Sequence, residues 1–262
     1  MNRNKPVIVR GGGDLATGII YRLWKIGFHV LVLEVDTPLM VRRTVSAASA
    51  VYNGFISIED MQVKLIDRLE DFSVDFDNVQ VIVDPEGNSI DKIKPDILID
   101  AIMAKKNIGT RIDMAPLVLA IGPGFTAPKD VHAVIETKRG HTLGRVITKG
   151  TAIPDTGVPG MIKGYSIERL LRSPDDGYLF PIRKIGDEVS VDEIVGYVNG
   201  KEVRSQLDGV LRGLIHPHVR LKKGLKIGDV DPRGDPAHCF SISDKALSIA
   251  GGVLEAIMSF RY

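Results

Sequence analysis

The chain has 262 residues, of which 44% are hydrophobic, and its 34 lysines and arginines nearly balance 33 aspartates and glutamates. The resulting net charge of +1 gives no overall attraction to nucleic acid or to an anionic membrane, so we expect neither as a partner. The hydrophobic content argues against a disordered chain, and the length fits one large or two small domains.

The cysteine content is typical of a reduced, intracellular protein. Cys239 is the single cysteine, so it cannot form an intramolecular disulfide and cannot by itself supply a zinc site of the usual four-ligand kind. We therefore predict no metal site. The N-terminal residues lack the apolar core of a signal peptide, and no stretch approaches the roughly 18–20 apolar residues that span a bilayer. The sequence predicts a cytoplasmic protein.

The first forty residues predict a strand, a helix and a second strand. An apolar run at 7–9 leads to glycines at 11–13, and apolar residues then recur at helical spacing up to Gly27. A second apolar run at 30–33 ends at Glu34. Two parallel strands joined by a helix form a right-handed crossover, so we expect this unit to begin a parallel sheet.

The glycine turn is a candidate nucleotide site. From Gly11 it reads Gly-x-Gly-x-x-Ala, a variant of the dinucleotide-binding fingerprint. In that motif the glycines let the backbone approach a pyrophosphate at a helix N-terminus, and an acid after the second strand accepts a hydrogen bond from a ribose hydroxyl. We assign Gly11, Gly12, Gly13, Asp14 and Glu34 to a nucleotide or other anionic ligand. A purely structural turn is the alternative, in which Asp14 caps the helix.

Further apolar runs at 79–83, 97–99, 117–121 and 131–135 predict more buried strands and hence a Rossmann-like open sheet. Ligands of open α/β sheets bind beyond the carboxyl ends of the strands. That position selects Lys105, Gly122 and Gly124 as further ligand-binding candidates, and His141 as a candidate catalytic group for proton transfer. The alternatives are a solvated lysine and simple glycine turns.

The C-terminal part contains related short segments. Asp-Gly-Tyr-Leu at 176–179 is echoed by Asp-Gly-Val-Leu at 208–211, and Lys-Ile-Gly-Asp at 184–187 recurs at 226–229. These segments resemble the barrel-sandwich hybrid of biotinyl and lipoyl carrier domains, and residues 243–258 predict a capped amphipathic helix. We therefore expect an α/β protein with a Rossmann-like domain at 1–173, followed at 174–262 by an all-β, barrel-sandwich-like domain with a terminal helix.

Cys239 is the second candidate catalytic residue. It follows His238 and shortly precedes the predicted helix. Such surroundings can lower the pKa of a thiol and create a nucleophile or a carrier of sulfide or selenide. The alternative is a small buried hydrophobic side chain.

Several motifs together resemble a known family. They are VRGGGDLATG at 9–18, AIGPGFTA at 120–127, DVHAVIET at 130–137, DTGVPG at 155–160, KIGDVDPR at 226–233 and GGVLEA at 251–256. Spread over essentially the whole chain, they are similar to the accessory-protein family of the selenium-dependent molybdenum hydroxylase system. The resemblance implies a role in maturing the molybdenum site of such a hydroxylase, the expected partner, by handling the molybdopterin dinucleotide cofactor or labile selenium. It supplies no catalytic residues.

These observations lead to one principal hypothesis and two alternatives. The principal hypothesis is a hydroxylase maturation factor that binds a nucleotide-type ligand, such as the molybdopterin dinucleotide. One alternative is a nicotinamide-nucleotide-dependent enzyme, which the fingerprint and Glu34 favour. The other is a non-catalytic assembly protein whose C-terminal domain docks the hydroxylase. The sequence does not decide whether the chain catalyses a reaction.

Overall fold

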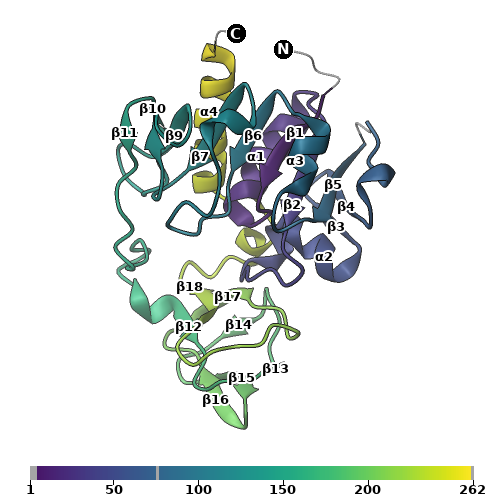
Figure 1. The fold of residues 1–262 in the computed structure, drawn as a ribbon. Helices are drawn as coiled ribbons and strands as arrows, with labels where there is room; N and C mark the ends of the chain where they lie inside the picture. The colour runs from purple at the N-terminus through teal and green to yellow at the C-terminus, as the bar shows by residue number, and fades with distance from the viewer. Residues whose placement is uncertain (1–4, 75–76, 261–262) are drawn as a thin grey trace. The chain divides into compact units, whose positions relative to one another are not determined.

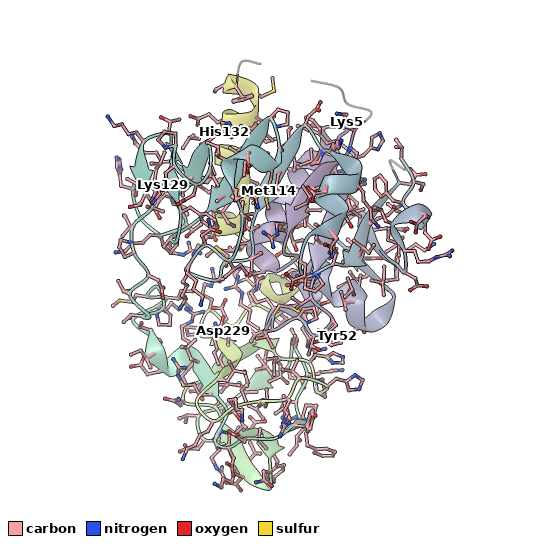
Figure 2. All side chains as sticks on the ribbon, in the orientation of Figure 1. Lys5, Tyr52, Met114, Lys129, His132 and Asp229 are labelled. Atoms are coloured by element: carbon pink, nitrogen blue, oxygen red, sulfur yellow. The ribbon has the colours of Figure 1, made fainter. Side chains whose placement is uncertain are left out.

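The computed structural model describes residues 5–74 and 77–260, which form two compact units (Figure 1). Unit 1 contains residues up to 36, residues 46–156 and those from 242 onward, and unit 2 contains residues 37–45 and 157–241. His132 belongs to unit 1 and Asp229 to unit 2 (Figure 2). This division differs from the predicted one, because residue 173 lies inside unit 2 and the terminal helix belongs to unit 1.

Unit 1 is built on a mixed sheet of nine strands, in the order β10-β9-β7-β6-β1-β2-β5-β4-β3 among the described residues. The strands are β1 (Val7–Arg10), β2 (Val30–Glu34), β3 (Phe55–Ile58), β4 (Met61–Ile66), β5 (Asn78–Val83), β6 (Ile97–Asp100), β7 (Leu117–Ile121), β9 (Ala133–Ile135) and β10 (Val146–Ile147). Neighbours pair in parallel except at the two edges, where β3–β4 and β9–β10 are antiparallel. A separate pair joins β8 (Thr126–Ala127) and β11 (Gly150–Thr151).

The helices of unit 1 are α1 (Asp14–Lys25), α2 (Ala50–Asn53), α3 (Asn88–Ile93) and α4 (Asp244–Ser259). Alternation along the strands buries both faces of the sheet, with Ile8 on one face and Val7 and Val9 on the other. Ile8 belongs to an apolar cluster that continues through Leu31 and Leu98 on the neighbouring strands. Within the described residues, none of the helices has the length and apolar character needed to cross a bilayer.

Unit 2 contains two small antiparallel sheets. The four-stranded sheet has the order β12-β18-β17-β14, and the three-stranded sheet has the order β13-β15-β16. The strands are β12 (Leu170–Arg172), β13 (Leu179–Pro181), β14 (Glu188–Val189), β15 (Ile194–Val198), β16 (Lys201–Arg204), β17 (Gly209–Leu214) and β18 (Lys226–Asp231). Residues 37–45 join this unit along β17, where the amide of Leu214 donates to the carbonyl of Val41 at 2.8 Å.

The predicted fold class is wrong beyond the α/β assignment. The large sheet is mixed and has nine strands, with an antiparallel hairpin, β3–β4, extending one edge, so it is not the expected Rossmann-like sheet. The barrel-sandwich prediction also fails, because it took the echoed segments for two related half-units. Lys226–Asp229 lies within β18, whereas Lys184–Asp187 forms a turn before β14. The terminal helix, expected to complete the β domain, packs in unit 1.

Helix α4 packs on α1 and on strands β7, β9 and β10 through positions that admit no side chain. A Cβ on Gly18 would lie 2.7 Å from Ala246, and a Cβ on Gly252 would lie 2.0 Å from the carbonyl oxygen of Gly144. The predicted helix cap is confirmed, because the Ser243 hydroxyl accepts a hydrogen bond from the amide of Ala246 at 3.2 Å. Gly252 of α4 is therefore required by main-chain contact.

The adjacent glycines of α4 provide a matched pair of variants. Gly251→Ala is expected to stabilise the protein by up to about 1 kcal/mol, because a Cβ there meets open space and alanine is the better helix former. Gly252→Ala is expected to destabilise it by roughly 1–3 kcal/mol, because the Cβ collides with main chain. Urea unfolding measures both. Equal stability of the two variants would contradict this packing.

Candidate functional site

The carboxyl ends of the parallel strands in unit 1 form the candidate site, which we call the strand-end rim. It comprises the turn 11–14, the loops 101–107, 122–125, 136–141 and 152–156, and the first turn of α4. The strand order reverses here, because β1 is flanked by β2 on one side and by β6 on the other (Figure 1). Such reversal points are where open α/β sheets bind ligands.

The glycine turn is shaped by contacts within the protein. Gly11 has φ +91°, and a Cβ on it would lie 2.9 Å from the carbonyl oxygen of Ala101. A Cβ on Gly12 would lie 2.8 Å from the amide nitrogen of Ala48, which donates to the carbonyl of Gly12 at 2.8 Å. Gly13 is different, because nothing lies within 4 Å of a Cβ built there. Two of the three glycines are thus explained by packing, and the third borders open space.

Glu34 holds the glycine turn in place. Its Oε2 accepts the amide hydrogen of Gly12 at 2.7 Å, and its Oε1 accepts that of Val35 at 2.9 Å. Burial raises the pKa of the Glu34 carboxyl, and the two amide hydrogen bonds oppose this shift. The predicted ribose acceptor therefore already binds main chain.

Asp14 is the first residue of α1 but does not cap it through its side chain. Gly13 occupies the N-cap position, and no side-chain capping bond is made there. A carboxylate in the first turn is favourable to the helix dipole. The amides of that turn have no partner inside the helix, as in every α-helix. The turn therefore presents both an acid and main-chain donors to the rim.

The remaining predicted ligand-binding residues lie in loops that pack on one another. A Cβ on Gly124 would lie 2.7 Å from the Cα of Lys106, and one on Gly122 would lie 2.8 Å from the hydroxyl of Thr137. Lys105 has φ +62°, and its ammonium lies 2.6 Å from the Asp155 carboxylate in an exposed pair. The structure thus brings these loops together, and Lys105 already has a counter-charge.

Lys245, in the first turn of α4, is a residue of the rim that sequence reasoning did not assign. Its side chain is partly buried. Burial lowers the pKa of Lys245, while the carboxylates of Asp14, Glu136 and Asp155 act in the opposite direction. Within residues 5–74 and 77–260, the ammonium forms no hydrogen bond and no ion pair. A lysine in the first turn of a helix, where positive charge is unfavourable, was the available sequence signal.

Two of the three carboxylates that act on Lys245, Glu136 and Asp155, have other partners. Both oxygens of Glu136, which is 2% exposed, accept main-chain amide hydrogens, from Lys138 at 2.7 Å and from Ile153 at 2.8 Å. Asp155 is paired with Lys105. Lys245 is therefore a cation near two acids that have other partners and near Asp14, which acts on it electrostatically.

The two candidate catalytic residues lie in different units. His141 is exposed in the loop between β9 and β10 of unit 1. Cys239 is fully buried in unit 2, with its Sγ 3.8 Å from the carbonyl oxygen of Leu211. Burial raises the pKa of the Cys239 thiol, which is opposite to the shift expected of a nucleophile. Among the described residues, no group of three or more His, Cys, Asp or Glu side chains could hold a metal ion.

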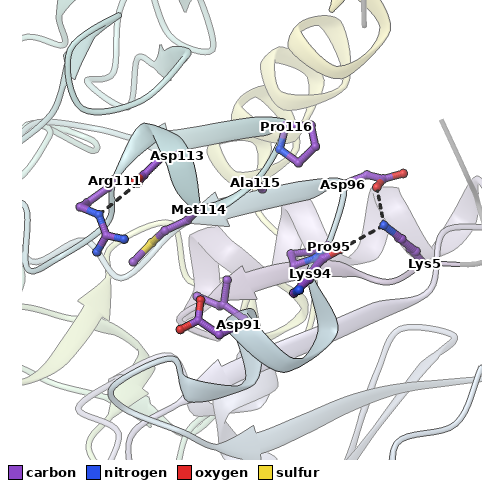
Figure 3. A pocket seen from close by; sticks show the side chains of 11 residues that line it. Lys5, Asp91, Lys94, Pro95, Asp96, Arg111, Asp113, Met114, Ala115 and Pro116 are labelled. Carbon is purple, nitrogen blue, oxygen red and sulfur yellow. Dashed lines mark hydrogen bonds and ion pairs between the residues drawn. The ribbon is translucent and has the colours of Figure 1, made fainter.

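A cavity of about 700 Å³ lies at the opposite end of the strands from the rim, at the amino ends of β6 and β7 (Figure 3). Four of its six charged residues form two ion pairs. The ammonium of Lys5 donates to Asp96 at 3.1 Å, and Arg111 pairs with Asp113 at 3.0 Å. Most of the charge that lines the cavity is therefore already paired.

Comparison with known proteins gives one sequence relative. No protein-family model matches the chain. The chain is 44% identical over 254 residues to the uncharacterized protein YqeB of Escherichia coli (strain K12). This match covers 96% of the chain but 47% of YqeB, so the chain spans about half the length of the curated relative.

Solved structures with a weak likeness include two aspartoacylase-related proteins and an ectoine utilization protein. A succinylglutamate desuccinylase/aspartoacylase from Rhodobacter sphaeroides matches 32% of this chain and 30% of its own, with 17% identity and a TM-score of 0.23. An aspartoacylase family protein from Mesorhizobium loti matches 80% and 59%, with 13% identity and a TM-score of 0.26. The ectoine utilization protein EutE (DoeB) from Ruegeria pomeroyi matches 86% of both chains, with 9% identity and a TM-score of 0.26. Scores this low carry no functional argument.

The burial of Cys239 predicts an unreactive thiol. Because it is the single cysteine, a chromogenic disulfide reagent reports on it alone. We expect the native protein to react at least about tenfold more slowly than the same protein unfolded in urea, since the thiol is buried and its pKa is raised. A native rate equal to the unfolded rate would restore Cys239 as a candidate nucleophile.

Proposed function

We propose that the chain is a cytoplasmic accessory factor in the maturation of a selenium-dependent molybdenum hydroxylase. In this proposal the strand-end rim binds an anionic ligand of nucleotide type, such as the molybdopterin dinucleotide cofactor. The maturation role and the hydroxylase partner rest on the sequence motifs described above. The binding role rests on one observation, the partly buried ammonium of Lys245 that lacks a hydrogen-bonding or ion-pairing partner in the described chain.

A partly buried cation without a partner favours a bound anion. Removing a charge from water costs free energy unless a counter-charge or hydrogen bonds replace the lost solvation. Three carboxylates act on Lys245, and two of them have other partners. Glu136 accepts main-chain amides and Asp155 pairs with Lys105, while Asp14 acts on the ammonium without a hydrogen bond to it. A phosphate group would supply the missing counter-charge, and the amides at the N-terminus of α1 would add donors to it.

The approach route to the rim passes Gly13. Its Cβ position is open, whereas the corresponding positions of Gly11 and Gly12 are filled by main chain. A ligand can therefore lie against Gly13 and the first turn of α1, but not in the space beside Gly12 that Ala48 occupies. The packing of Gly11 and Gly12 corrects the interpretation of the dinucleotide fingerprint in which all three glycines face a pyrophosphate.

The alternative of a nicotinamide-dependent enzyme is less well supported. It relied on Glu34 as acceptor for a ribose hydroxyl, and both carboxylate oxygens of Glu34 already accept main-chain amides. The third hypothesis, a non-catalytic assembly protein, stays a prediction. The ligand proposal is the one that the charges of the rim favour.

Lys245→Gln tests the charge requirement of the rim. We expect protein purified anaerobically to release a nucleotide-type ligand detectable by liquid chromatography and mass spectrometry, and cytidine diphosphate to bind in calorimetric titration. The variant should bind cytidine diphosphate roughly 10–100-fold more weakly, because a hydrogen bond to a charged group contributes about 1.5–3 kcal/mol. Lys129→Gln, at an exposed lysine of unit 1, is the control. If Lys245→Gln bound cytidine diphosphate with unchanged affinity, the proposal that the strand-end rim binds the ligand would be wrong.

Gly13→Val tests the approach route. The backbone of Gly13 has φ −65° and ψ 179°, which valine adopts without strain, and the side chain enters open space. We therefore expect a folded variant that loses cytidine diphosphate binding, with a stability loss of only about 1 kcal/mol because valine is a poorer N-cap residue than glycine. Retained binding in a folded variant would mean that no ligand lies against this turn.

A further inference from the structure

Unit 2 contains a buried cluster of charges that the proposed function does not use. Arg212 on β17 and Asp231 on β18 lie at its centre, with 8% and 0% of their surfaces exposed. Their strands are paired neighbours in the four-stranded sheet. Two further arginines, Arg42 and Arg233, act electrostatically on Arg212. Positive charge is therefore gathered around one carboxylate.

The two carboxylates of the cluster, Asp229 and Asp231, accept hydrogen bonds from arginines other than Arg212. Arg169 places Nη2 at 2.9 and 3.0 Å from the two oxygens of Asp229, which is labelled in Figure 2. Arg233 donates to both oxygens of Asp231, with Nη2 at 2.6 Å from Oδ2 and Nε at 2.9 Å from Oδ1. Asp231 consequently has its pKa lowered to about 2, and it stays ionised at neutral pH.

Arg212 is left without an acceptor of its own. Its Nε lies 3.6 Å from Oδ2 of Asp231, beyond hydrogen-bonding distance, and this nitrogen is fully buried with no partner. In the described part of the chain its guanidinium makes no hydrogen bond. The terminal nitrogens are not among the buried atoms that lack a partner, so they retain contact with solvent. The Nε atom of Arg212 is thus buried, whereas its two terminal guanidinium nitrogens are accessible to solvent.

Arg42 lies beside Arg212 because its segment runs along β17. A Cβ on Gly213 would lie 3.0 Å from the carbonyl oxygen of Val41, so glycine lets the two segments approach closely. Arg42 donates from Nη2 to the carbonyl of His238 at 3.0 Å and to that of Ser241 at 3.2 Å. Burial lowers the pKa of Arg212, and the charge of Arg42 lowers it further. Four guanidinium groups therefore face two carboxylates.

A structural role would give Arg212 acceptors within the fold. Buried arginines that stabilise proteins are hydrogen-bonded to carboxylates or carbonyls, because a buried donor without an acceptor carries its full desolvation cost. Arg169 meets this condition and Arg212 does not. An anion from solvent that reaches the terminal guanidinium nitrogens of Arg212 would best supply the missing acceptor.

We propose that Arg212, with Arg42 and Arg233 beside it, forms a binding site for a phosphate or similar oxyanion group in unit 2. A guanidinium fork presents parallel N–H donors that match two oxygens of such a group. The excess of positive charge supplies the attraction and discriminates against cations. This site is in a different unit from the strand-end rim and does not depend on the function proposed for the rim.

The test uses inorganic phosphate as the probe and the full chain. Thermal unfolding is followed in phosphate and in sodium chloride of equal ionic strength, for wild type, Arg212→Met and Arg220→Met. Arg220 is an exposed arginine of the same unit and serves as the control. We expect millimolar phosphate to raise the Tm of wild type and Arg220→Met by roughly 2–4 °C over chloride. Arg212→Met should lose this rise while keeping at least the wild-type Tm in chloride.

Two results would overturn the proposal. One is a wild-type Tm that is equal in phosphate and in chloride. The other is an Arg212→Met variant that is less stable than wild type in chloride yet keeps the full phosphate response, since that pattern belongs to a structural arginine. Repeating the titration with ribose 5-phosphate distinguishes the source of the group. Tighter binding than inorganic phosphate assigns the site to a phosphorylated metabolite, and equal or weaker binding assigns it to the free anion.

Discussion

Unit 1 depends on the close approach of main chain around the turn that follows β1. Gly11 touches the segment after β6, Gly12 touches the segment at Ala48, and Glu34 at the end of β2 holds the amide of Gly12. Three parts of the chain that are distant in sequence therefore meet within van der Waals distance of one turn. Side chains at these glycines would force main chain apart, which is costlier than the displacement of a flexible side chain. The strand-end rim inherits its shape from this packing.

The sequence predicted the inner strands of the large sheet and missed its edges. The runs at 79–83, 97–99 and 117–121 correspond to β5, β6 and β7, because strands covered on both faces appear as continuous apolar runs. β4 is a half-exposed strand in which Gln62 and Lys64 alternate with buried residues, and β3 is mostly exposed. Such strands carry a weak signal, so the mixed sheet could not be recognised as one. The fold class was wrong for this reason.

The candidate site was predictable in position but not in contacts. The predicted residues Gly11–Gly13, Lys105, Gly122 and Gly124 all lie at strand ends along the rim, and their binding role stays a prediction. A glycine signal reports that the backbone has no room for a side chain, and it does not report what fills that room. Here main chain fills it at Gly11 and Gly12, and open space remains at Gly13. Lys245 was missed despite its unfavourable place in the first turn of a helix, because the sequence does not show that α4, from the far end of the chain, packs at the rim.

Lys245 and Arg212 share a property that separates them from the other buried charges of the chain. Glu136, Asp229 and Asp231 are each held by hydrogen bonds, as buried carboxylates in stable proteins are. The two cations have no hydrogen bond within the described residues, and burial lowers the pKa of both. A native state that is stable by about 5–15 kcal/mol gains nothing from such groups, and apolar side chains would serve packing better. Such cations are useful when the protein binds an anion. Lysine and arginine side chains that lack acceptors within the fold are therefore the strongest guide to its ligands.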